Sequence, residues 1–153
     1  MKRFGWLCLL LSLTAARPAY AACSVSASAL PFGNYNPLSV LPTDAVGQVT
    51  VNCSFVISVL TTYTVKLSTG GSGQYSTRQM SSAANTLGYN LYTDALRLII
   101  WGNGTGGSSF ITNTQLIGIG GFTGNHPVYG RIPAQQNVAA GSYSDTITVT
   151  LDY

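Results

Sequence analysis

The last eight residues of the chain alternate between apolar and polar side chains without a fault. The odd positions from 147 to 153 carry Ile, Val, Leu and Tyr, and the even positions from 146 to 152 carry Thr, Thr, Thr and Asp. A period of two predicts a β-strand that buries one face and exposes the other. A chain whose clearest pattern has this period is expected to fold as a β-sheet protein.

Further β-type runs are spread along the chain and separated by turn-forming residues. The stretch Val46–Cys53 is rich in Val, Tyr63–Leu67 alternates, Leu87–Tyr92 alternates in part, and Arg97–Trp101 is a short apolar run. After residue 21 no window shows a capped helical stripe, so we predict one all-β sandwich of about six to eight strands. The turn clusters are Gly33–Asn34, Asn36–Pro37, Gly70–Gly73, Gly102–Ser109, Gly118–Gly124 and Gly141–Ser142.

The first 21 residues have the three parts of an export signal. Met1–Arg3 is basic, Phe4–Ala16 is apolar, and Ala19–Ala21 has the small-x-small pattern of a cleavage site. The apolar run is shorter than the roughly 20 residues that cross a bilayer. We predict a signal peptide over residues 1–21 and one exported domain over residues 22–153, with a lipoprotein acylated at Cys23 as the alternative.

The charge content excludes several classes of partner. Charged residues make up 7% of the chain, against about 25% in ordinary soluble proteins. There is no Glu, and the cations Lys2, Arg3 and Arg17 lie in the predicted signal peptide, which leaves as many Lys and Arg as Asp. Without clustered cations we expect no nucleic-acid binding and no polybasic attachment to membranes.

The cysteines fit an oxidising compartment. Cys8 lies in the predicted signal peptide, which leaves the pair Cys23 and Cys53. A disulfide between them would close a loop of about 30 residues and stabilise the fold by roughly 3–4 kcal/mol. A metal site and a reactive thiol are the alternatives, but two sulfurs and one His do not complete a zinc site without Asp.

Candidate catalytic groups are few. His126 is the only His and precedes Pro127 in a Gly- and Asn-rich segment, so we expect it in a loop and not as a general base. Residues 102–107 match Gly-x-Gly-x-x-Gly, but a strand-like segment follows where a nucleotide site needs a helix. We therefore expect no enzyme activity, catalytic residue, cofactor, metal or small-molecule substrate. A sugar-binding module that uses exposed Tyr and Trp is a separate alternative.

An apolar segment directly after Cys53 has two interpretations. It is either a buried strand that continues past Cys53 or an exposed loop used for contact with another surface. In the second interpretation the adhesive side chains are Phe55, Val56, Ile57, Val59 and Leu60.

Several short blocks, taken in order, resemble the spore coat protein U domain, which is shared with pilins of the archaic chaperone–usher class. The resemblance covers residues 22–153. The blocks are Cys23, Phe32–Tyr35, Val49–Cys53, Tyr63–Leu67, Arg78–Met80, Leu87–Tyr92, Trp101–Gly106, Val128–Gln136 and Gly141–Thr146.

The resemblance implies an incomplete immunoglobulin-like β-sandwich that lacks its last strand. In this family a periplasmic chaperone lends a strand, and a neighbouring pilus or coat subunit replaces it after passage through an outer-membrane usher. The protein would then pass through the periplasm and end in a fimbrium, on the cell surface or in secreted form. The residues expected to face the donated strand are Ile147, Val149, Leu151 and Tyr153.

The start of the predicted mature chain departs from the family pattern. Only Ala22 precedes Cys23, whereas polymerising pilins of this class carry an alternating apolar tail there, which they donate. We therefore expect a terminal, tip-like subunit that accepts a strand and acts in adhesion and biofilm formation. Tip adhesins usually carry a second domain, so a secreted coat protein of spores or cysts remains an alternative.

Overall fold

The computed structural model describes residues 22–54, 59–117 and 120–153. The predicted signal peptide and most of the apolar segment after Cys53 lie outside these residues. The described elements are β1 (Ala22–Ala27), β2 (Thr43–Ser54), β3 (Val59–Leu67), the short 3-10 helix η1 (Gly70–Ser72), β4 (Arg78–Ser82), β5 (Asn85–Tyr92), β6 (Ile111–Ile117), β7 (Phe122–Ile132) and β8 (Val149–Asp152).

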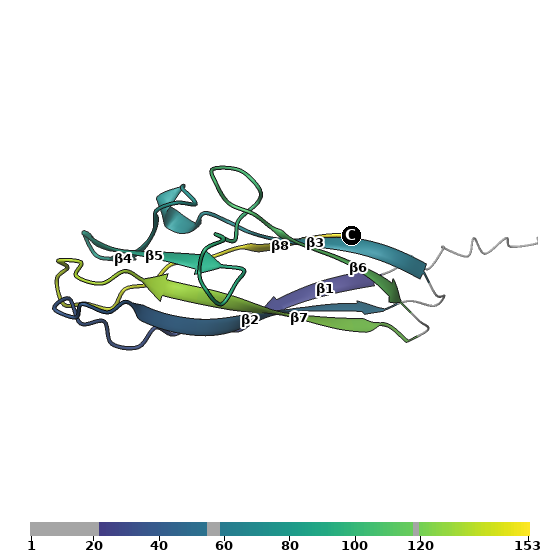
Figure 1. Cartoon of the computed structure of the whole chain (residues 1–153), viewed down its shortest axis with the longest axis horizontal. Coiled ribbons are helices and arrows are strands. Elements are labelled where there is room, and N and C mark those ends of the chain that lie inside the picture. The colour runs from purple at the N-terminus through teal and green to yellow at the C-terminus, as the bar shows by residue number, and fades with distance from the viewer. Residues whose placement is uncertain (1–21, 55–58, 118–119) are drawn as a thin grey trace, which may run out of the picture.

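The strands form two sheets that face each other (Figure 1). One sheet has the order β1-β2-β7-β5-β4 and the other has the order β6-β3-β8, with every neighbouring pair antiparallel. Figure 1 shows β3 and β8 in the upper layer and β2 and β7 in the lower one. The prediction of an all-β two-sheet sandwich is confirmed.

The long pair β2 and β7 is the framework of the larger sheet. Its register runs from Thr43 opposite Ile132 to Cys53 opposite Phe122. Alternate side chains of β2 are buried toward the other sheet, where β3 presents its own buried set. Each large apolar side chain buried in this way contributes about 1.5–3 kcal/mol. The core side chains of these two strands are Val49, Val51, Cys53, Tyr63, Val65 and Leu67.

The predicted disulfide is present. Cys23 of β1 lies directly opposite Cys53 of β2 in the register, and the two sulfurs are bonded. The bond therefore fastens the edge strand β1 to the central part of its sheet.

A buried arginine connects the core to the loops around it. The side chain of Arg78 is 0% exposed, and its guanidinium donates to the backbone oxygens of Ser68 and Trp101 and to Oδ1 of Asn90 at 2.7–3.1 Å. Burial lowers the pKa of this guanidinium, but its four hydrogen bonds keep a buried cation tolerable.

The interpretation of Gly118–Gly124 as a turn cluster is wrong from Phe122 onward, because β7 begins there. The expectation that His126 lies in a loop is also wrong, because β7 contains it. A glycine occupies position 124 because a Cβ there would collide with the Tyr63 hydroxyl. Pro127 is tolerated inside β7 because β5 pairs with β7 only at residues 129–131, so the strand has an open edge at the proline.

The C-terminal strand is shorter than its alternation predicted. The ladder of β8 with β3 covers Val149–Asp152, whereas Thr146–Thr148 lie outside it. The reason is that β3 ends at Leu67. Beyond that point Thr148 exchanges two hydrogen bonds of 2.9 Å with Ser68, one through the Ser68 hydroxyl.

Candidate functional site

A groove of about 480 Å³ lies between the sheets, where β1 ends and β8 begins. Its two walls are chain segments that flank those strands, and its floor consists of core side chains from both sheets. One wall contains residues 27–30 and Phe32, the other contains residues 143–147 and Val149, and the floor includes Val49, Leu67, Met80, Leu91 and Val128.

The wall that leads into β8 is covered only in part. From residue 143 to residue 152 the odd positions are half-buried and the even positions are exposed, and none is fully buried. In contrast, Val49 and Val51 at comparable positions of β2 are 1% and 0% exposed. The inward face of this wall therefore has the alternation of a core strand without the burial of one.

Two edge strands, β1 and β8, each contribute a residue to the lining of the groove. Figure 1 shows where these two strands lie. β8 pairs with β3 alone, and β1 is the edge strand of the other sheet. Within the described ranges no strand pairs with the second edge of either. Unpaired backbone N–H and C=O groups along such an edge are a template for pairing with another strand.

The four residues predicted to face a donated strand differ in their positions. Ile147 and Val149 line the groove. Leu151 is half-buried on the same face of β8, beyond the groove itself. Tyr153 follows the end of β8 and is 58% exposed.

Asp145, which is not among the predicted site residues, also lines the groove. Its Oδ2 accepts a hydrogen bond of 2.7 Å from the hydroxyl of Tyr89, and its Oδ1 accepts from the amides of Gly71 and Thr146 at 2.9 and 2.8 Å. Burial, reinforced by this carboxylate, raises the pKa of Tyr89. Extending the C-terminal alternation backward by two residues would have placed Asp145 on the inward face.

The groove continues into a second hollow of about 740 Å³. The two share Leu30, Phe32, Met80 and Tyr143, so the half-buried ring of Tyr143 lies where they meet. The second hollow runs along residues 30–35 on one side and residues 138–143 on the other. Together the two hollows follow the wall upstream of β8 well beyond its ladder.

The apolar segment after Cys53 is described only at its end. Phe55, Val56 and Ile57 lie outside the described residues, and Val59 begins β3. Leu60 is 71% exposed and lies directly opposite Leu116 of β6, which is 74% exposed. The end of the β3–β6 pair therefore presents two large apolar side chains to solvent.

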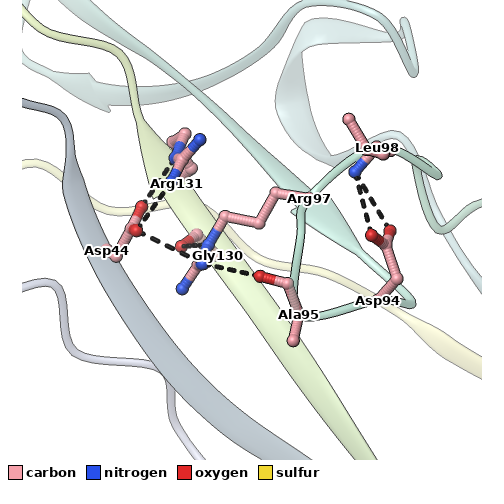
Figure 2. A network of polar contacts seen from close by, with 7 residues as sticks. All are labelled: Asp44, Asp94, Ala95, Arg97, Leu98, Gly130 and Arg131. Atoms are coloured by element: carbon pink, nitrogen blue, oxygen red, sulfur yellow. Dashed lines mark hydrogen bonds and ion pairs between the residues drawn. The ribbon is translucent and has the colours of Figure 1, made fainter.

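Further exposed apolar side chains lie in the loop after β5. Figure 2 shows the polar contacts of this loop. The expectation that Arg97–Trp101 forms a strand is wrong, because only single bridges occur at Ile100 and Trp101. Leu96 and Leu98 are each 75% exposed. The carboxylate of Asp94 accepts from the amides of Leu98 and Ile99, which fixes the turn.

An ion network anchors this loop to the larger sheet (Figure 2). Arg131 forms two hydrogen bonds of 2.8 Å with the carboxylate of Asp44, and Arg97 lies 3.3 Å from the same carboxylate. Hydrogen bonding to Arg131 lowers the pKa of Asp44. Arg97 also donates through Nε to the backbone oxygen of Gly130 in β7 and through Nη1 to that of Ala95 in the loop. Its guanidinium therefore ties the loop to β7.

The residues that the sequence offered as candidates for catalysis or nucleotide binding have structural positions in the fold. His126 is 8% exposed, and its Nε2 lies 2.9 Å from the Tyr63 hydroxyl. The glycine motif at residues 102–107 forms a loop that leads to β6. Among the described residues no three His, Cys, Asp or Glu side chains gather as metal ligands. In the same part of the chain no helix has the length and apolarity to cross a membrane.

The comparison with protein families agrees with this geometry. A model of the spore coat protein U domain matches residues 9–150. The chain belongs to the spore coat protein U domain family. The chain is 34% identical over 145 residues to Protein U of Myxococcus xanthus. The match covers 86% of this chain and 78% of that relative.

A solved structure shares the fold of this spore coat protein U domain. It is a chain in the crystal structure of the CsuC–CsuE chaperone–tip adhesion subunit pre-assembly complex, from archaic chaperone–usher Csu pili of Acinetobacter baumannii. The two are 25% identical with a TM-score of 0.60, and the match covers 88% of the present chain. It spans 40% of the other chain.

Proposed function

We propose that this spore coat protein U domain is a non-enzymatic subunit of a pilus-type surface assembly and accepts a β-strand from a partner in the groove between β1 and β8. The observation that carries the proposal is the half-buried inward face of residues 143–151, which borders an unpaired strand edge. The similarity to a chain of a chaperone–subunit complex supports it.

Addition of a strand would both pair the free edge of β8 and bury the apolar face beside it. Backbone groups of the incoming strand would pair with the free edge of β8, and its inward side chains would cover Ile147, Val149 and Leu151, with Tyr153 at the end. Covering the face removes apolar surface from water, at about 25 cal/mol per Å². The donated strand thus takes the place of the missing last strand of an immunoglobulin-like sandwich.

The partners in this proposal follow a sequence in time. Residues 1–21 direct export, and a periplasmic chaperone then occupies the groove of the domain over residues 22–153. An outer-membrane usher and a neighbouring pilus or coat subunit come afterward. A coat of spores or cysts uses the same groove, so the position within an assembly is a separate question.

Thermal unfolding of the oxidised domain, alone and with strand peptides, tests the proposal. We expect a low, aggregating transition for the domain alone and a rise of at least about 10 °C with an alternating apolar peptide, because a shift of 1 kcal/mol moves Tm by roughly 2–8 °C. A scrambled peptide of the same composition is the control. A high, reversible transition that ignores every peptide would indicate a complete sandwich, and ligand screens for a sugar-binding module would follow.

We further propose that the end of the β3–β6 pair is a contact surface of the assembled subunit. The specific observation is the exposed cross-strand pair Leu60 and Leu116. The chain segment that includes Phe55, Val56, Ile57 and Val59 leads into it. The similarity to a complex that contains a tip adhesion subunit supports a role in adhesion.

Replacement of Leu60 by Ser tests this surface. We expect the domain, stabilised by a strand peptide, to lose at least about half of its retention on an apolar bead, because one exposed Leu contributes up to about 2 kcal/mol on burial. The matched control is Thr62→Ser, on the same outward face of β3, where Thr62 bonds Thr114. Equal retention of both variants would place adhesion elsewhere.

A further inference from the structure

The inward face of the groove wall contains one charged residue in an apolar series. The half-buried positions read Tyr143, Asp145, Ile147, Val149 and Leu151, and the residues between them are exposed. A strand that covers this face must therefore pass one carboxylate among four large apolar side chains.

The carboxylate of Asp145 has capacity left for one more hydrogen bond. An ionised carboxylate offers about four lone-pair sites. Oδ1 accepts from the amides of Gly71 and Thr146, and Oδ2 accepts from the Tyr89 hydroxyl. The remaining site is on Oδ2, in a side chain that lines the groove.

The charge near this site favours a neutral partner over a cation. Among the described residues Asp145 forms no ion pair. The buried guanidinium of Arg78 is bonded to neutral oxygens only. Burial lowers the pKa of Arg78, and the negative charge of Asp145 is among the effects that oppose this. A second cation would be repelled by Arg78, whereas a hydroxyl or amide has no net charge for Arg78 to repel.

We propose that Asp145 fixes the register of the donated strand by requiring a neutral hydrogen-bond donor, a hydroxyl or a carboxamide, at one inward position of an otherwise apolar strand. This inference rests on the proposed function. Asp145 acts as a specificity-determining residue of the groove.

The physical basis is the cost of a mismatch. Adjacent inward positions of a strand are two residues apart, so a slip by two residues places an apolar side chain over Asp145 and the donor's hydroxyl over an apolar residue. Both groups then lose water without a partner, which is unfavourable. Slips between otherwise similar apolar positions carry no such penalty, and a single buried polar residue is known to fix register in coiled coils.

A peptide series on the oxidised wild-type domain tests the proposal. The host peptide has Val at five inward positions and alternating Lys and Glu at the outward ones. Thr replaces Val at one inward position at a time, because Thr and Val have the same shape and differ in the hydroxyl. We expect one Thr position to bind about tenfold more tightly than Thr at the other four, as a hydrogen bond to a charged group allows.

The variant Asp145→Asn tests whether the tighter binding of the preferred Thr peptide depends on the carboxylate. It keeps the shape and the acceptor for the two amides, but it puts an NH2 donor where Oδ2 accepts. We expect the advantage of the preferred Thr position to fall at least about threefold, since the Thr hydroxyl loses its charged acceptor and can only accept from a neutral amide. The matched control is Asp152→Asn, on the exposed face of the same segment, which should leave the order of the peptides unchanged. A preference that survives Asp145→Asn in full overturns the proposal.

Failure of the register role and failure of strand acceptance give different binding results. If the all-Val peptide stabilises the domain but every Thr position weakens binding equally, the register role of Asp145 is wrong and strand acceptance stands. If no peptide of the series binds, the groove accepts no strand, and both the proposed function and this inference are wrong.

Discussion

His126 is a buried histidine with a single polar partner, the hydroxyl of Tyr63 on the opposite sheet. Burial lowers its pKa below the ordinary value. The unfolded chain, with a histidine pKa of about 6.5, then binds the proton more readily than the folded one. The stability that neutral His126 contributes is therefore complete above pH 6.5 and is lost as the pH falls through the lowered pKa.

The variant His126→Gln tests this pH dependence, because glutamine stays neutral. We expect urea midpoints of the wild type to fall between pH 7.5 and pH 5 relative to those of the variant, with unfolding followed by fluorescence of the buried Trp101. The range stops at pH 5 so that the carboxylates remain ionised. Parallel midpoints would contradict the assignment of the histidine as a buried neutral group.

Single residues were the hardest part to predict. His126 was expected in a loop because glycines, Asn and a proline surround it, and those residues normally punctuate structure. Gly124 is instead required by the close approach of Tyr63, and the proline uses an open edge. Asp145 does not stand out in the sequence because its charge interrupts the apolar series, although the inward face of the segment continues through it.

At the scale of elements, the disulfide decides how firmly β1 is attached. β1 is an edge strand of six residues, and the Cys23–Cys53 bond fastens it to β2. The double variant Cys23→Ser, Cys53→Ser should lose roughly 3–4 kcal/mol of unfolding free energy, the loop-entropy value for a separation of about 30 residues. Urea unfolding measures the loss.

Reduction of the wild type with a thiol is the companion measurement, and it should give the same loss without a change of side chain. Because β1 leads into residues 27–30 of the groove wall, we also expect weaker binding of the strand peptide. Equal unfolding curves for the oxidised and reduced domain would show that the ladder alone holds β1.

Regular elements followed from the sequence where periodicity was strong. The alternation of Tyr63–Leu67 in β3 and of the residues in β8 predicted which of their faces are inward, whereas β2 was predicted only as a β-type run rich in Val. The lengths and partners of strands did not follow, because they depend on where a neighbouring strand ends, as Leu67 shows for β8. The apolar run Arg97–Trp101 misled because tertiary ion pairs hold it as a loop.

At the scale of the whole molecule, residues 22–153 contain as many Lys and Arg as Asp, so net charge does little to protect the groove of this domain from self-association. Little net charge means little repulsion between copies, and an exposed apolar edge invites pairing. We expect refolding of the domain alone to scatter light, and Val149→Lys to reduce the scattering because it places a charge inside the groove wall. Addition of a strand peptide should have the same effect on the wild type.

Thr150→Lys is the matched control for that experiment. It adds the same charge one residue away, on the exposed face, so net charge is equal in the two variants. If both variants lower the scattering equally, overall charge and not the groove governs association.

The position of the disulfide along β1 has a mechanical consequence. Cys23 is the second residue of that strand, and its partner lies near the far end of β2, the strand with the longest ladder of the sheet. A pulling force that enters the domain just before β1 would pass through a covalent bond into β2. The edge strand would then not have to resist peeling by its own hydrogen bonds, and the load would spread as shear along the register of β2 with β7.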